Sequence, residues 1–152
     1  MERVTDVAAA VESTVESLLA VLESARLAQS PAVPPTQLRV LTIIAGNRHT
    51  NMSRLAEALD VVPSSASRLC DRLVAAGVLE RVPGRTDRRE IALHLTPAGH
   101  RMLSDLRGDR RRRLAAVLER MSPAGRQALL RGLAEFDAVV NEADAEPEAR
   151  SA

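Results

Sequence analysis

Aromatic side chains are almost missing from this chain of 152 residues, which has no Trp, no Tyr and a single Phe, Phe136. The hydrophobic content of 45% is enough for a packed interior. That interior must be built from Leu, Val, Ala, Ile and Met, which suit helices packed on helices. A ligand pocket lined with aromatic rings has little to be built from.

Other features are also scarce. Cysteine occurs once, at Cys70, which excludes an intrachain disulfide and fits a reducing compartment. No apolar run approaches the roughly 18 residues that a membrane span needs, and the N-terminus lacks the basic start and apolar centre of a secretory signal. These absences predict a soluble, cytoplasmic protein without a membrane partner.

Catalytic and metal-binding patterns are lacking as well. His49, His94 and His100 are scattered along the chain, and one cysteine does not complete a ligand set with them. We find no Ser-His-Asp set, no paired carboxylates at a defined spacing and no Gly-rich phosphate loop. The sequence therefore predicts neither an enzyme nor a resident metal or cofactor.

Charge is distributed unevenly. All 21 basic residues are Arg and 20 residues are acidic, so the net charge is only +1. The acids gather near the N-terminus and after Glu135, which leaves the middle of the chain basic. The distribution of charge along the chain is more informative about binding partners than the net charge is.

Helical periodicity dominates the first part of the chain. An apolar stripe with spacings of three and four predicts a helix of about six turns within residues 1–30. This helix must bury its apolar side against later helices or a second copy of the chain. Thr36 is predicted to cap a second helix that ends at Gly46, and a third helix ends at Leu59.

A fourth helix is predicted from Pro63 to Ala76, after a short turn, and Gly77 ends it. Its apolar residues share one side, and its opposite side carries small hydroxyls and arginines. Two short helices joined by a tight turn form a helix-turn-helix arrangement. Small polar side chains let a helix approach base edges, and Arg reaches guanine or phosphate. The candidate DNA-binding residues of this helix are Ser64, Ser65, Ser67, Arg68 and Arg72.

A β-hairpin follows, with predicted strands at 78–82 and 91–95. Its tip carries Arg85, Arg88 and Arg89 around Asp87. A solvated charged loop is the simpler interpretation, but narrow minor grooves attract inserted arginines, which favours DNA as the partner. Two closing helices are predicted after the hairpin, each opened by a capping residue and a proline, at Thr96-Pro97 and Ser122-Pro123.

With these residues in order, the chain resembles the MarR-type winged-helix regulators of bacteria. The resemblance rests on Leu55-Ala56, Ser67-Arg68-Leu69, Gly77, Glu80-Arg81, Asp87-Arg88-Arg89, and Leu95-Thr96 followed by Gly99. It implies a homodimer held by the first, fifth and sixth helices, with each fourth helix in a major groove. It also implies that Arg89 enters the minor groove, that Asp87 braces the wing through a salt bridge, and that Arg85 and Arg88 contact the DNA backbone.

The predicted fold is mainly α with a small β-hairpin wing. We expect an N-terminal dimerisation helix at 1–30, a winged helix-turn-helix domain at 36–96, C-terminal dimerisation helices at 97–143 and a disordered tail at 144–152. The resemblance implies a dimeric, sequence-specific DNA-binding transcriptional regulator, most often a repressor, that binds a palindromic operator in double-stranded DNA and is released by a small-molecule effector. Two alternatives stay open: a protein-interaction module, and a redox-responsive regulator switching through Cys70, although a lone inward-facing Cys is more often a small buried hydrophobe.

Overall fold

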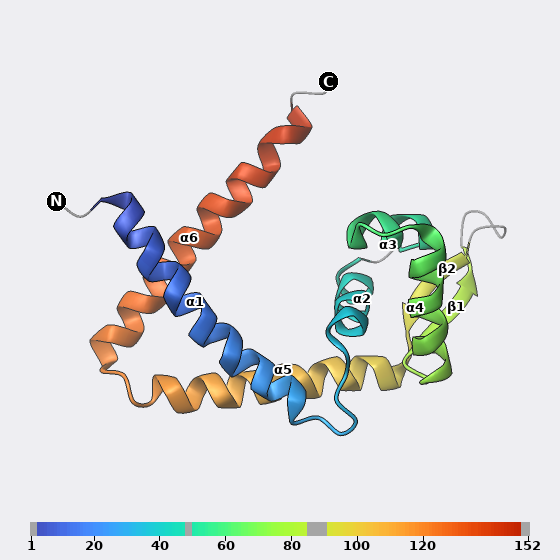
Figure 1. Ribbon diagram of the computed structural model, residues 1–152, viewed down its shortest axis with the longest axis horizontal. Helices are drawn as coiled ribbons and strands as arrows, with labels where there is room; N and C mark the ends of the chain where they lie inside the picture. The colour runs from blue at the N-terminus through green and yellow to red at the C-terminus, as the bar shows by residue number, and fades with distance from the viewer. Residues whose placement is uncertain (1–2, 48–49, 85–90, 150–152) are drawn as a thin grey trace. The chain divides into compact units, whose positions relative to one another are not determined.

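The computed structural model describes residues 3–47, 50–84 and 91–149, with 143–149 described as backbone alone. The chain divides into two compact units, Met1–Arg113 and Leu114–Ala152. The predicted fold class is confirmed, because the regular elements among the described residues are helices and one two-stranded antiparallel hairpin (Figure 1). In chain order the elements are α1 (Val4–Leu27), α2 (Pro35–Gly46), α3 (Met52–Leu59), α4 (Pro63–Ala75), β1 (Leu79–Pro83), β2 (Ile91–Leu95), α5 (Pro97–Leu118) and α6 (Pro123–Ala149).

A single apolar core joins α2, α3, α4 and the hairpin to the first half of α5. It contains aliphatic side chains and one thiol, as the absence of aromatic residues requires. The largest members exposed by 2% or less are Val40, Leu41, Leu55, Cys70, Leu73, Leu79, Leu93 and Leu106. Two apolar residues next to this core lie outside it: Val74, at the edge of the buried side of α4, and Ile91, at the far end of the hairpin, are exposed.

The segment before α3 forms an unpredicted addition to the hairpin. The Leu93 amide donates to the Thr50 carbonyl at 2.9 Å, and Asn51 forms an antiparallel bridge with Ala92. Thr50 is buried as a result. The start of α3 is therefore attached to β2 by backbone hydrogen bonds, which positions the helix-turn-helix against the wing.

Side-chain caps form at the predicted Thr96 and Ser122, and also at Asn51, which was not predicted to cap a helix. Asn51 accepts from the Arg54 amide at 2.9 Å, Thr96 from the Gly99 amide at 3.1 Å, and Ser122 from the Gly125 amide at 3.0 Å. The predicted Thr36 cap is wrong. The second helix begins at Pro35, two residues earlier than a Thr36 cap implies, because a proline at the first helical position has no amide to leave unsatisfied.

The end of α4 explains why the first strand starts one residue later than predicted. Gly77 has φ +72°, the left-handed conformation that glycine adopts without steric cost. The Gly77 amide donates to the Val74 carbonyl at 2.9 Å and the Val78 amide to the Leu73 carbonyl at 3.1 Å, the pair of bonds of a Schellman motif. Val78 is thus still part of the helix end, and β1 begins at Leu79.

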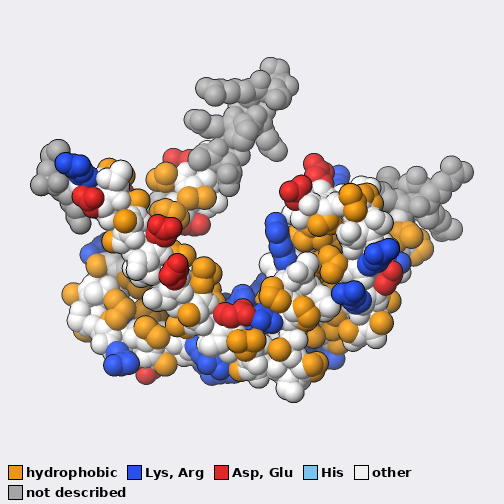
Figure 2. Space-filling view, viewed as in Figure 1, with side chains coloured by type: hydrophobic (Ala, Val, Ile, Leu, Met, Phe, Trp, Pro, Cys, Tyr) orange, Lys and Arg blue, Asp and Glu red, His pale blue; other side chains and the backbone are white. Residues whose placement is uncertain are grey.

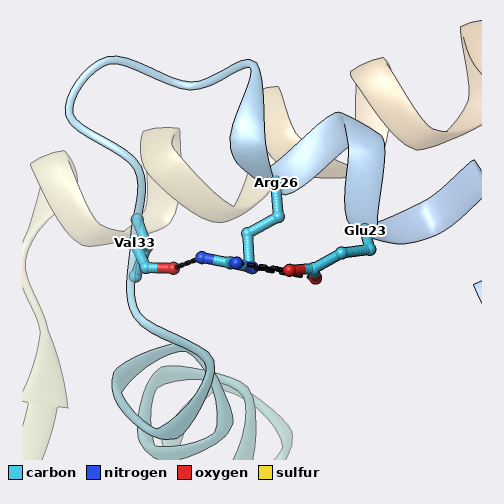
Figure 3. Close-up of polar contacts among 3 residues, drawn as sticks. All are labelled: Glu23, Arg26 and Val33. Carbon is cyan, nitrogen blue, oxygen red and sulfur yellow. Dashed lines mark hydrogen bonds and ion pairs between the residues drawn. The ribbon is translucent and has the colours of Figure 1, made fainter. Parts of the chain in front are cut away.

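A polar clamp holds the end of α1 to the segment that leads into α2 (Figure 3). Arg26 is buried, and its guanidinium donates to both carboxylate oxygens of Glu23 and to the Val33 carbonyl. The hydrogen bond from Arg26 lowers the pKa of Glu23 below its ordinary value of 4.5. The Glu23 carboxylate and the Val33 carbonyl therefore compensate the charge of the buried Arg26.

Both long terminal helices expose apolar faces within their own units. The exposed apolar residues of α1 include Val4, Val7, Val11, Val15, Leu18 and Leu19, and those of α6 are Leu129, Leu130, Leu133, Phe136, Val139 and Val140. Figure 2 shows hydrophobic side chains on the surface along α1, next to acidic ones. Runs of exposed apolar side chains along one helix differ from the scattered apolar residues of an ordinary surface.

The last helix is longer than predicted. Its backbone stays helical to Ala149, so residues 144–149 of the segment expected to be a disordered tail are helical. Ala and Glu in this stretch are strong helix formers, whereas Pro147 is a poor one. Within the described part of the chain, none of the helices has the length and hydrophobicity that crossing a membrane requires.

Candidate nucleic-acid interface

The exposed side of α4 carries all five residues predicted for it. Its buried side is formed by Ala66, Cys70 and Leu73. At about 100° per residue, Ser64 and Arg68 lie near the middle of the opposite arc. The two flanks of this arc are occupied by Ser67 with Asp71, and by Ser65 with Arg72.

Exposure agrees with this arrangement. Ser64, Arg68 and Arg72 are exposed, whereas Ser65 and Ser67 are half-buried. Figure 2 shows basic side chains on the surface formed by α4. The structure therefore brings the five residues onto one face, with a serine and an arginine at its centre.

One residue on β1 ties this face to the wing. The Arg81 Nη2 atom lies 2.8 Å from the Asp71 carboxylate. The same nitrogen donates to the Ser67 carbonyl at 3.4 Å and to the Ser67 hydroxyl at 3.3 Å. The Ser67 flank of α4 is thereby held against the hairpin.

Sequence reasoning did not assign a role to Arg81, although a signal was available. Along β1, Arg81 is two residues from Leu79 and lies opposite Leu93, and both leucines are buried. Side chains two apart on a strand share a face, so Arg81 stands on the core-facing side of the hairpin. From this position Arg81 reaches across to α4 and pairs with Asp71.

The wing is described up to its tip. Five residue pairs form its stem, from Leu79 opposite Leu95 at the base to Pro83 opposite Ile91 at the far end. The candidate tip residues Arg85, Asp87, Arg88 and Arg89 lie outside the described residues. The stem places the two ends of the tip segment beside each other.

Comparison with known proteins agrees with this geometry. Residues 33–90 match the model of the MarR family. A transcriptional regulatory protein for the hcr operon of Thauera aromatica is 34% identical over 64% of this chain and 59% of its own length. The transcriptional repressor MdtR of Bacillus subtilis is 30% identical over 59% of this chain and 58% of its own length. The chain thus spans less than two thirds of these curated relatives.

A solved structure extends the similarity to most of the chain. RV1404 from Mycobacterium tuberculosis is 31% identical, with 91% of this chain and 94% of that chain covered and a TM-score of 0.82. The chain belongs to the MarR family. The family model covers α2, α3, α4 and β1, which are the elements that carry the α4 face and Arg81. MarR proteins and the two curated relatives are transcriptional regulators and not enzymes.

In this MarR chain, Cys70 lies on the buried side of α4 and is completely inaccessible. Burial raises the pKa of its thiol, and the nearby Arg81 charge only partly opposes this. A buried thiol with a raised pKa contains little of the thiolate that reacts with peroxide. The geometry favours the small buried hydrophobe over the redox switch. Across the described residues, no group of three or more His, Cys, Asp or Glu side chains is placed to hold a metal.

Proposed function

We propose that this protein is a dimeric, sequence-specific DNA-binding transcriptional regulator. The observation that carries the proposal is the polar and basic face of α4, held against a β-hairpin within a MarR fold. A helix of this kind fits the major groove, and the hairpin beside it reaches the adjacent minor groove.

Some residues of α4 are proposed to contribute to affinity for DNA and others to base specificity. Arg68, at the centre of the face, is placed to reach a guanine edge, and a good bidentate contact is worth about 1–3 kcal/mol against the wrong base. Ser64 is small and exposed beside it, so the helix can approach the bases closely. Arg72 lies farther along the helix and suits a phosphate. Arg85 and Arg88 are proposed as further phosphate contacts, and Arg89 as the minor-groove contact braced by Asp87.

Dimerisation is the second part of the proposal. The apolar faces of α1 and α6 need a partner surface, and a second copy of the chain presents the same faces. Light scattering after gel filtration should give twice the 16.4 kDa chain mass. A monomer at micromolar concentration would argue against this part. A two-fold dimer predicts a palindromic operator whose half-sites lie about one helical turn apart, roughly 10 bp.

The sign of regulation and its control follow the family pattern. We propose repression, as for the relative MdtR, and release from DNA by a small molecule. BpsR of Bordetella bronchiseptica, which shares the fold at 17% identity, has its DNA binding regulated by 6-hydroxynicotinic acid. A panel of small carboxylic acids, with 6-hydroxynicotinic acid included, should contain a compound that releases a preformed complex in a gel-shift titration.

Selection from a random duplex pool tests DNA recognition directly. The wild-type protein should enrich one palindromic motif, and binding to it should weaken steeply as salt rises, because phosphate contacts release counterions. Arg68→Ala should lower affinity for the enriched duplex and relax preference at a defined base pair. Binding that does not distinguish the selected duplex from random DNA at moderate salt would favour the alternative, a protein-interaction module.

A further inference from the structure

The Arg81 contacts give the serine beside them a defined hydrogen-bonding role. Nη2 of an arginine carries two protons. One of them serves the short ion pair with Asp71 at 2.8 Å, and the other is shared between the carbonyl and hydroxyl oxygens of Ser67. Asp71 therefore anchors the guanidinium, and Ser67 lies within its reach.

The Ser67 hydroxyl accepts from Arg81 and keeps its own proton. In other helices of the chain a hydroxyl proton is used locally: Thr14 donates to the Ala10 carbonyl at 2.8 Å and Thr42 to the Leu38 carbonyl at 2.9 Å. Ser67 has no such bond among the described residues. Because one lone pair accepts from Arg81, the hydroxyl proton is free to point away from Arg81, toward the exposed side of α4.

We propose that Arg81 is a specificity-determining positioning residue, which holds Ser67 as a hydrogen-bond donor to a base acceptor in the major groove. The inference rests on the proposed DNA-binding function. It adds a role in base discrimination for Arg81, which lies on the wing. Guanine O6 and N7, adenine N7 and thymine O4 are the acceptors for such a donor, whereas the cytosine amino group offers a donor in their place.

The same contacts cancel a charge that would oppose binding. Asp71 is exposed on the α4 face, where an isolated carboxylate repels phosphate. Arg81 neutralises it at 2.8 Å while its own side chain remains only 33% exposed. Exposed ion pairs add little to stability, so the main effect of the Arg81–Asp71 pair is to position Ser67 and α4.

The test compares base preferences of full-length variants. Wild type, Ser67→Ala, Arg81→Ala, Arg81→Lys and Asp71→Asn would each be titrated against the selected operator and its single-base-pair variants. Arg81→Lys keeps the positive charge but loses the planar fork that serves both partners. Arg39→Ala is the matched control, because Arg39 Nη2 donates to the Ala58 carbonyl on α3 at 3.3 Å, away from the α4 face. Circular dichroism melts show whether each variant is folded.

We expect Ser67→Ala to lose preference at one base pair by about threefold to tenfold, as removal of one hydrogen bond predicts. Arg81→Ala and Arg81→Lys should lose preference at the same base pair, and the Ser67→Ala/Arg81→Ala double variant should lose no more than either alone. Asp71→Asn should lower the same preference while raising affinity for all duplexes. Arg39→Ala should keep the wild-type pattern.

Two results overturn the inference and leave the proposed function standing. In the first, the Arg81→Ala variant loses the same affinity for every duplex, which would mean that Arg81 acts only through its charge. The other is an unchanged preference in folded Arg81→Ala and Arg81→Lys variants. A wild-type protein that enriches no motif at all would instead remove the proposed function.

Discussion

Gly99 should not tolerate even a methyl group. A Cβ atom built on Gly99 would lie 2.2 Å from the Val78 carbonyl oxygen, 3.2 Å from its carbon and 3.4 Å from Leu95 Cβ. The first distance is well under the 3.0 Å that real Cβ contacts essentially never undercut. The clash is with backbone, so no side-chain rotation relieves it.

The surrounding hydrogen bonds prevent an easy shift. The Val78 carbonyl accepts from the Thr96 amide at 3.2 Å, and the Thr96 hydroxyl donates to the Gly77 carbonyl at 2.7 Å while accepting from the Gly99 amide at 3.1 Å. Moving α5 away from Val78 would disturb these bonds at the base of the hairpin. Overpacking in a tight core costs about 1–3 kcal/mol, and a backbone clash belongs at the upper end of that range. Alanine returns up to about 1 kcal/mol of helix propensity.

Gly99→Ala should therefore reduce the free energy of unfolding by about 2 kcal/mol, which corresponds to a fall in Tm of roughly 4–8 °C for a chain of this size. Circular dichroism at 222 nm is the appropriate readout, as the chain has no Trp and no Tyr. Protein concentration must be held constant, since dimerisation shifts the apparent Tm. Gly46→Ala is the control: its Cβ meets nothing within 4 Å, and Tm should stay unchanged or rise slightly. A Gly99→Ala protein that melts with wild type would refute the steric argument.

Three further predictions concern the wing, the thiol and the clamp. Arg89→Ala should lower operator affinity about tenfold or more in a gel-shift titration while light scattering still shows a dimer, because a minor-groove contact is lost; equal affinity would exclude Arg89 from the interface. Peroxide should leave DNA binding of wild type and Cys70→Ala unchanged, since the thiol is buried and its pKa is raised; a wild-type loss that Cys70→Ala prevents would establish the redox alternative. The Arg26 hydrogen bond lowers the pKa of Glu23 below 4.5, so the unfolded chain binds this proton more readily than the folded one. The stabilisation from this pair should be complete above about pH 4.5 and should disappear as pH falls through the lowered pKa of Glu23. Between pH 6 and pH 3, the urea midpoint of the Glu23→Gln variant should therefore fall less than that of wild type. Equal decreases in the two midpoints would count against the clamp.

Local signals explain which elements were predictable. The two confirmed capping residues, Thr96 and Ser122, and Pro63 act within one helical turn, and Gly77 acts on its own backbone, so each is visible in a few consecutive residues. Errors arose where two local signals competed. Thr36 and Pro35 both suit a helix start, and the first strand began one residue late because Val78 completes the end of α4.

The five candidate residues of α4 were found from periodicity, because a 3.6-residue repeat places them on one face whatever the helix packs against. Their unequal exposure could not be found in this way. Ser67 is half-buried because β1 lies beside its flank, and Ser64 is exposed because nothing described covers the centre of the arc.

What the sequence determines by itself is the order of the helices, their ends, the hairpin and the polar face of α4, since short-range geometry and hydrophobic spacing suffice for these. Only the tertiary structure decides that Thr50 pairs with Leu93, that Gly99 rests on the Val78 carbonyl, and that Arg81 reaches Ser67 and Asp71. Each of these contacts joins two elements whose relative position depends on the whole core. The hydrophobic effect that forms the core is non-directional, so hydrophobic spacing does not say which polar atoms will meet. Those contacts are decided only when the chain has packed.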